Sequence, residues 1–215
     1  MSSMFSMGNV QGVKVATGGS YLKAGIHKVT FKSIELTDKG MELIFENADG
    51  THRELMFEPR SSERTNSQFG PNPSEAEQFM CKVKQVIAAL DPELAAAIDT
   101  DGAKFAAPNF AAFVKLVKKY LDPKVGSETF IKLIPTSGNF VGFPGFPAKL
   151  NKDGILYMST KFIGEDLTLT SAEATRIENA AKAAPTDMKS KGTELDDLKA
   201  EFEAGPEESD DDLPF

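Results

Sequence analysis

Three short runs of alternating apolar and polar residues constrain the fold of this chain more than any other feature. The runs cover residues 26–36, 41–45 and 53–57, and turn sequences at 38–40 and 48–50 separate them. Alternation with a period of two places successive side chains on opposite faces of a strand. The sequence therefore predicts an antiparallel three-strand meander. The side chains expected on its buried face include Val29, Phe31, Ser33, Met41, Leu43, Phe45, Leu55 and Phe57.

A helical segment is predicted over about residues 74–122, after a polar loop at 58–73. Ser74 and Glu77 have the spacing of a capping box, which begins a helix whose apolar residues recur every three or four positions until Asp91-Pro92. Further helices are expected over the ranges 92–98 and 109–121.

Two more strands are predicted at 128–135 and 154–162, and the long loop 136–152 between them contains phenylalanines set among glycine and proline. In these strands Ile131, Leu133, Leu156 and Met158 are expected to face the core. The side chains expected to face outward are Phe130, Lys132, Ile134, Tyr157, Ser159 and Lys161. A last helix is predicted to begin after Thr170 and to end before Pro185.

Three strands, a helical insertion and two strands follow one another in the order of an OB-fold, a five-stranded Greek-key barrel. The predicted class is mainly β with an α insert (α+β), with the insertion between strands three and four. A small sandwich with the same number of strands remains an alternative. The predicted domains are a flexible arm at 1–20, the OB-fold domain at 21–185 and a disordered acidic tail at 186–215.

The net charge of −8 is located entirely in the predicted tail. Residues 186–215 contain eleven acids and three bases, so that residues 1–185 carry 21 charges of each sign. A terminal block of like charge usually acts as an interaction tail. The neutral body can still concentrate its lysines on one face, as a nucleic-acid ligand requires.

The sequence DDDLPF at residues 210–215 closely resembles the C-terminal peptide of bacterial single-stranded DNA-binding proteins. A terminal phenylalanine offers a ring and an α-carboxylate to an apolar pocket rimmed by cations, and neighbouring aspartates steer the peptide to basic surfaces. The resemblance implies binding of replication, recombination or repair proteins. The residues implied are Asp210, Asp211, Asp212, Leu213, Pro214 and Phe215.

The body is more similar to the single-stranded DNA-binding proteins of tailed bacteriophages, which pair a divergent OB-fold with an acidic tail. This similarity lies in LKAGIHKVTFKSIEL, residues 22–36, followed by a hairpin. It implies sequence-nonspecific binding that protects single-stranded DNA in the cytoplasm of a bacterial host. The alternative is a recombination mediator, annealing protein or adaptor that docks on replication enzymes through the tail without holding DNA strongly. Self-association, the number of nucleotides covered and a preference for DNA over RNA stay open.

Single strands are held by aromatic faces that stack on bases and by cations that follow the phosphates. Aromatic and basic residues alternate on the predicted outer face of the barrel. Further phenylalanines lie in the loop before the fifth strand, where OB-folds commonly contact oligonucleotides. Glycine and proline around them are expected to expose these rings, and the alternative is a loop that folds back onto the core or contacts another subunit. The candidate DNA-binding residues are Lys28, Lys32, Arg53, Phe130, Lys132, Phe143, Phe146, Tyr157 and Lys161. Arg60 and Arg64 are weaker candidates for extending the cationic track.

Catalysis is not expected. The chain contains no phosphate-binding glycine loop and no nucleophile elbow, and its two histidines, His27 and His52, are expected to be half-buried strand residues rather than ligands. Cys81 is the only cysteine, so no internal disulfide, zinc site or cofactor is predicted. The sequence shows neither a signal peptide nor a membrane span, which predicts a cytoplasmic protein without a membrane partner.

Overall fold

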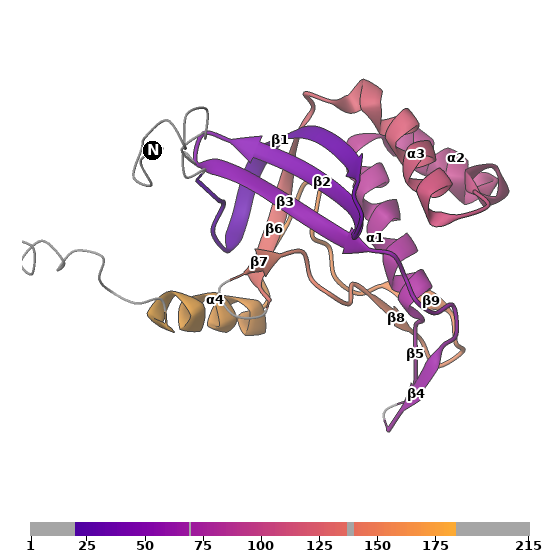
Figure 1. The fold of residues 1–215 in the computed structure, drawn as a ribbon. Coiled ribbons are helices and arrows are strands. Elements are labelled where there is room, and N and C mark those ends of the chain that lie inside the picture. Colours follow the sequence, from indigo (N-terminus) through magenta and orange to yellow (C-terminus); the bar gives the residue numbers. More distant parts are fainter. Residues whose placement is uncertain (1–19, 69, 137–139, 184–215) are drawn as a thin grey trace, which may run out of the picture. The chain divides into compact units, whose positions relative to one another are not determined.

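The computed structural model describes residues 20–68, 70–136 and 140–183, and the fold is mixed α/β (Figure 1). Five strands form one antiparallel sheet in the order β3-β2-β1-β6-β7, which curls into a nearly closed barrel. The sheet strands are β1 (Gly25–Leu36), β2 (Gly40–Asn47), β3 (Gly50–Phe57), β6 (Glu128–Pro135) and β7 (Val141–Gly142). Two short hairpins pair outside it, and their strands are β4 (Thr65–Ser67), β5 (Gly70–Asn72), β8 (Ala148–Leu150) and β9 (Leu156–Met158).

Four helices accompany the strands in the described part of the chain: α1 (Glu75–Leu90), α2 (Pro92–Thr100), α3 (Phe110–Leu121) and α4 (Ser171–Ala183). The chain divides into two units, Met1–Ile177 and Glu178–Phe215, and the contacts discussed below belong to the first. The predictions for the arm at 1–19 and for the tail at 186–215 lie outside the described residues.

The helices begin and end where their capping residues predict. The Ser74 hydroxyl accepts the Glu77 N–H at 3.1 Å, and the Glu77 carboxylate accepts the Ser74 N–H at 2.8 Å, which completes the capping box of α1. Asp91 ends α1 and caps α2 through the Leu94 N–H, and Asn109 caps α3. Each cap satisfies backbone donors that the first turn of a helix leaves without a partner.

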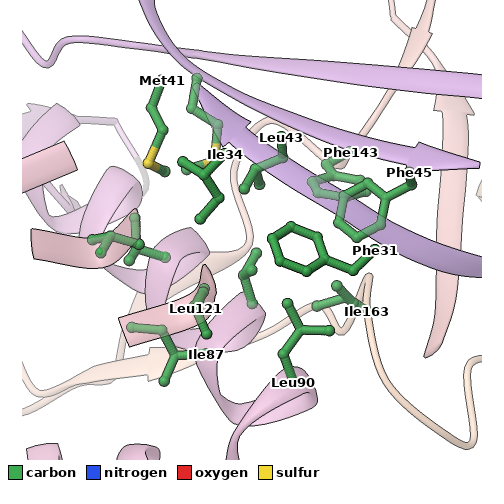
Figure 2. Close-up of a cluster of buried hydrophobic side chains, with 14 of the residues drawn as sticks. Phe31, Ile34, Met41, Leu43, Phe45, Ile87, Leu90, Leu121, Phe143 and Ile163 are labelled. Carbon is green, nitrogen blue, oxygen red and sulfur yellow. The ribbon is translucent and has the colours of Figure 1, made fainter. Parts of the chain in front are cut away.

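Helices α1 and α3 cover the inner face of the sheet, where one hydrophobic core joins both layers (Figure 2). Strands β1 and β2 contribute alternate residues, as predicted from their period of two. The largest fully buried side chains from sheet and helices include Phe31, Ile34, Met41, Leu43, Phe45, Ile87 and Leu121.

A β-bulge in β1 changes which side chain follows Phe31 into the core. The pairing with β2 runs from Phe31 opposite Phe45 to Ser33 opposite Ile44, so the register shifts by one residue around Lys32. Beyond the shift, Ile34 is buried and Ser33 is only half-buried. The prediction that Ser33 faces the core is wrong because an alternating pattern cannot reveal the extra residue of a bulge.

The predicted inward face of β3 is also wrong. His52, Glu54 and Met56 are buried, whereas Phe57 is 65% exposed. In the β2–β3 register His52 lies opposite Phe45, and residues directly opposite each other share a face. The buried polar groups satisfy one another, since His52 Nε2 lies 3.1 Å from Glu54 Oε2 and this carboxylate oxygen accepts the Phe143 N–H at 2.9 Å.

The segments on either side of the helices contain more strand than predicted. The polar loop 58–73 includes the β4–β5 hairpin, and the loop 136–152 includes β7 and β8. Of the predicted fifth strand only Leu156–Met158 is a strand, and it pairs with β8 rather than with the main sheet. Residues that follow β9 return to the barrel, where Ile163 forms an isolated bridge with Ile131 of β6.

Candidate nucleic-acid interface

Three of the predicted binding residues line one groove of about 1130 Å³ beside β6. Lys28 comes from β1, Phe130 from β6 and Lys161 from the segment that follows β9. We call this hollow the β6 groove. Its wall also contains Gln85 from α1 and the polar residues Ser159 and Thr160.

Strand pairing holds the aromatic and basic side chains of the groove together. Lys28 lies opposite Phe130 in the antiparallel β1–β6 ladder, so their side chains share one face. The Phe130 carbonyl accepts the Gly164 N–H at 2.9 Å, which keeps the turn after Lys161 against the same strand. The Phe130 ring remains 38% exposed, enough to present part of a flat apolar surface to solvent.

Two glutamines on α1, which were not predicted to contribute, hold neighbouring backbone segments in place, and Gln85 is the one that lines the β6 groove. Gln85 Nε2 donates to the Thr160 carbonyl at 2.8 Å, and Gln85 Oε1 accepts the Phe162 N–H at 3.2 Å. Gln78, two turns earlier, exchanges a donor and an acceptor with the backbone of Ala148 in β8 at 2.8 and 3.0 Å. The signal in the sequence was two amides flanking an apolar helix stripe, spaced to lie on one face.

The cations of the β6 groove already have partners, but exchangeable ones. Lys28 Nζ lies 2.6 Å from Glu128 Oε2, and the two side chains are 56% and 65% exposed. The Lys161 ammonium donates to the Glu165 carbonyl. An exposed ion pair of this kind contributes only about 0–1 kcal/mol, so a phosphate can replace the carboxylate at small cost.

Lys32 and Arg53 do not line the β6 groove. Each is exposed on the meander and paired with a glutamate, Lys32 with Glu46 at 3.0 Å and Arg53 with Glu42 at 2.9 Å. The structure therefore separates these two predicted cations from the set formed by Lys28, Phe130 and Lys161.

The prediction that Lys132 faces outward is wrong. Its side chain is 3% exposed, and its ammonium lies 2.9 Å from Glu173 Oε1 and donates to the Thr168 carbonyl at 3.1 Å. Glu173 also accepts the Thr170 N–H as part of the capping box of α4. Burial alone would raise the pKa of Glu173, but the Thr170 amide and the Lys132 ammonium together hold it below its ordinary value.

Phe143 is likewise buried, which contradicts its predicted exposure in the loop. The ring is 2% exposed and lies in the core beside Phe45, as Figure 2 shows. Its centroid is 4.5 Å from that of Phe162 and 5.7 Å from that of His52. The loop folds back onto the barrel because Glu54 accepts the backbone N–H of this residue inside the core.

Phe146 and Tyr157 are exposed but lie outside the β6 groove. Phe146 is 81% exposed and lines a second groove near α1, together with the weaker candidate Arg60. Tyr157 lies in β9, directly opposite Lys149 of β8.

Arg64 is committed to structure. Its guanidinium donates to both oxygens of Glu77 at 2.6 to 3.1 Å and to the Gly154 carbonyl at 3.1 Å. The hydrogen bond from Arg64 lowers the pKa of Glu77, and burial opposes this shift only in part. Because Arg64 ties α1 to the turn before β9, it is not available to extend the cationic track.

The predicted partner-binding residues 210–215 lie outside the described residues. Within the part of the chain that the structure describes, no group of three or more His, Cys, Asp or Glu side chains could hold a metal ion. No helix among those residues is both long and apolar enough to cross a bilayer. Neither a family model, nor a curated protein, nor a solved structure matches this chain.

Proposed function

We propose that the protein binds single-stranded DNA without sequence preference and holds it in the β6 groove of a barrel of the OB type. The observation that carries the proposal is the meeting of Lys28, Phe130 and Lys161 in one groove, from three separate segments of the chain. Stacking on an aromatic face accepts any base, and lysines on either side of it can follow the phosphates.

The arrangement of the groove favours a single strand over a duplex. A base can stack on Phe130 only if its own face is free. Bases in a duplex are already stacked between their neighbours, so they cannot use this surface. The groove is lined by few cations, and two glutamates, Glu128 and Glu165, lie among them. Stacking must then supply much of the affinity, because a strongly basic track for a duplex backbone is missing from this groove.

The order of the elements supports the finer part of the proposal, that the barrel is an OB-fold with a helical insertion. Helices α1, α2 and α3 follow the β1–β3 meander and precede β6 in the chain. We propose that β7 and the segment around Ile163 together complete the barrel beside β6, where a single regular fifth strand was predicted.

Titration of labelled oligo-dT against the full chain over a salt series tests the function. Each phosphate contact on a single strand lowers log K by about 0.7 per log unit of salt, so the two groove lysines predict a slope of roughly −1.4. Phe130→Ala should weaken binding by about 1–3 kcal/mol, the usual contribution of one stacked base. Phe140→Ala is the matched control because Phe140 is an exposed phenylalanine that lines neither groove.

Equal affinity for duplex DNA, the absence of a salt slope, or the same effect for both phenylalanine variants would refute the proposal. An adaptor that only docks on replication enzymes would show no affinity for oligo-dT at all. The titration therefore also separates the two functions that the sequence left open.

We further propose that residues 210–215 recruit replication, recombination or repair proteins. The proposal rests on the acidic run Asp210-Asp211-Asp212 followed by Leu213-Pro214-Phe215. Phe215→Ala in the full chain should remove recruitment of such enzymes to DNA-bound protein while the affinity for oligo-dT stays the same. Recruitment that survives this change would contradict the role of the peptide.

A further inference from the structure

A second groove, of about 980 Å³, lies between the end of β3, the β4–β5 hairpin, α1 and β8. Figure 1 shows both hairpins near the N-terminal end of α1. Two phenylalanine side chains line it and are largely open to solvent: Phe57 is 65% and Phe146 81% exposed. We call this hollow the hairpin groove. Exposed aromatic rings on a monomer surface are costly to leave in water and commonly mark an interaction site.

A partly buried cation without an ion-pair partner among the described residues lies in the same groove, which the carboxylates of Glu58, Glu63 and Glu75 also line. Lys82 of α1 is half-buried and makes no hydrogen bond or ion pair with any residue that the structure describes. Burial lowers the pKa of its ammonium, and the charge of Glu54 opposes this shift only in part. Taking a cation out of water without a partner is unfavourable, so an anion bound in the groove would restore what the fold removes. Lys149 of β8 adds a second, exposed ammonium.

Helix α1 and the β8–β9 hairpin contribute residues to both grooves. Gln78 and Lys82 line the hairpin groove, and Gln85 and Ala89 line the β6 groove. Their spacing of three or four residues places all four on one face of α1. The β8–β9 hairpin also joins them, since Ala148 lines one groove and its paired residue Met158 lines the other.

The loop that presents Phe146 is held in place. The carbonyl of the next residue, Pro147, accepts the Ser159 N–H at 2.7 Å and the Thr160 N–H at 3.1 Å. Ser159 and Thr160 themselves line the β6 groove. A backbone fixed in this way loses little conformational freedom when a flat ligand stacks on the ring that it presents.

We propose that the hairpin groove binds a further stretch of the same DNA strand, with Phe57 and Phe146 stacking on bases and Lys82 and Lys149 contacting phosphates. This inference rests on the proposed function of the β6 groove. The hairpin groove has two open rings and lysines, and one hairpin separates it from the β6 groove. This arrangement fits a strand of alternating bases and phosphates better than an acidic peptide, which needs one closed apolar pocket.

Binding of two oligo-dT lengths to the full chain tests this inference. The lengths are about 5 and about 15 nucleotides, which bracket the range that one OB-type domain covers. The variants Phe146→Ala and Lys149→Gln alter exposed side chains, so folding is not at risk. Each variant should weaken binding of the longer oligonucleotide and change binding of the shorter one by less than about twofold. For Phe146→Ala the loss on the longer one should be about fivefold or more, which is the lower end for one lost stacked base. Phe140→Ala again serves as the control.

The outcomes separate the two proposals. Suppose that the unchanged protein binds both lengths. If neither variant weakens binding of the longer oligonucleotide, or if a variant weakens binding of both lengths equally, the hairpin groove is not a second DNA subsite. If the unchanged protein binds neither length, the proposed function fails and this inference with it. A third outcome would also overturn the inference. If Phe146→Ala abolishes binding of a synthetic peptide of residues 207–215 and leaves DNA binding unchanged, the groove binds a peptide.

Discussion

Replacing Glu128 by glutamine should tighten the binding of single-stranded DNA. The Glu128 carboxylate lies 2.6 Å from the Lys28 ammonium at the mouth of the β6 groove, and both side chains are more than half exposed. A phosphate that reaches Lys28 must displace this carboxylate or lie beside it. Glutamine keeps the size of the side chain and removes only its charge.

The expected gain follows from two terms. Breaking an exposed ion pair costs about 0–1 kcal/mol. The variant lacks the Lys28–Glu128 pair, so this cost no longer opposes DNA binding. A phosphate about 5 Å from a carboxylate is repelled by about 0.8 kcal/mol in water before salt screening reduces the value. Together these terms predict about 0.5–1.5 kcal/mol, or a 2- to 10-fold decrease in Kd at low salt.

Fluorescence anisotropy with labelled oligo-dT measures this change, and Asp99→Asn provides the control. Asp99 pairs with Lys84 between α2 and α1 and lines neither groove, so its replacement makes the same change in net charge elsewhere. The advantage of Glu128→Gln over the control should shrink as salt increases. If both variants bind DNA with the same affinity at low salt, the strand does not pass Lys28 and the placement of DNA in the β6 groove is wrong.

Three predictions concern stability, each measured by urea denaturation of the full chain. Phe143→Ala should lower the free energy of unfolding by about 3–5 kcal/mol because it leaves a cavity in the core, and a loss no larger than that of Phe140→Ala would show that the ring is not buried. Glu173→Gln should cost a similar amount, about 3–5 kcal/mol, because the Lys132 ammonium stays buried without its counter-charge. The fold lowers the pKa of Glu173, so the ionised carboxylate contributes to the free energy of unfolding above the pKa of the unfolded chain. This contribution is lost as pH falls through the pKa of the folded state. The stability of Glu173→Gln should therefore be less sensitive to acid than that of the unchanged protein. Ser74→Ala should cost about 1 kcal/mol through loss of the α1 cap, and an unchanged midpoint would contradict the capping box as a source of stability.

Local signals in the sequence were sufficient for the helices and for the inward face of β2. Caps and helix ends depend on residues only a few positions apart, so Ser74, Asp91 and Asn109 could be interpreted without knowledge of the fold. The alternation of β2 was equally clear because every inward position carries a large apolar side chain.

Apart from Ser33, which the bulge in β1 displaces, the errors arose where a distant residue decides the environment. Lys132 is buried because Glu173, forty-one positions later, supplies its counter-charge, and no pattern within β6 contains that information. In β3, the alternation of Leu55 and Phe57 indicated the wrong face because the buried pair of His52 and Glu54 is stabilised by the backbone of a remote loop. The same remote contact carries Phe143 into the core.

Three of the nine candidate binding residues line the β6 groove, and helix α1 supplies a part of its wall that was not predicted. Phe130 and Lys28 could be identified because aromatic and basic residues shared a face with a period of two. Helix α1 lines both grooves, and its Gln78 and Gln85 hold the backbone on either side of the β8–β9 hairpin. A helix that binds two separated backbone segments through side-chain amides fixes their distance. In the β6 groove α1 supplies neither a ring nor a charge. Its two amides lie two turns of helix apart and set the spacing that a strand crossing the hairpin would meet in the proposed complex.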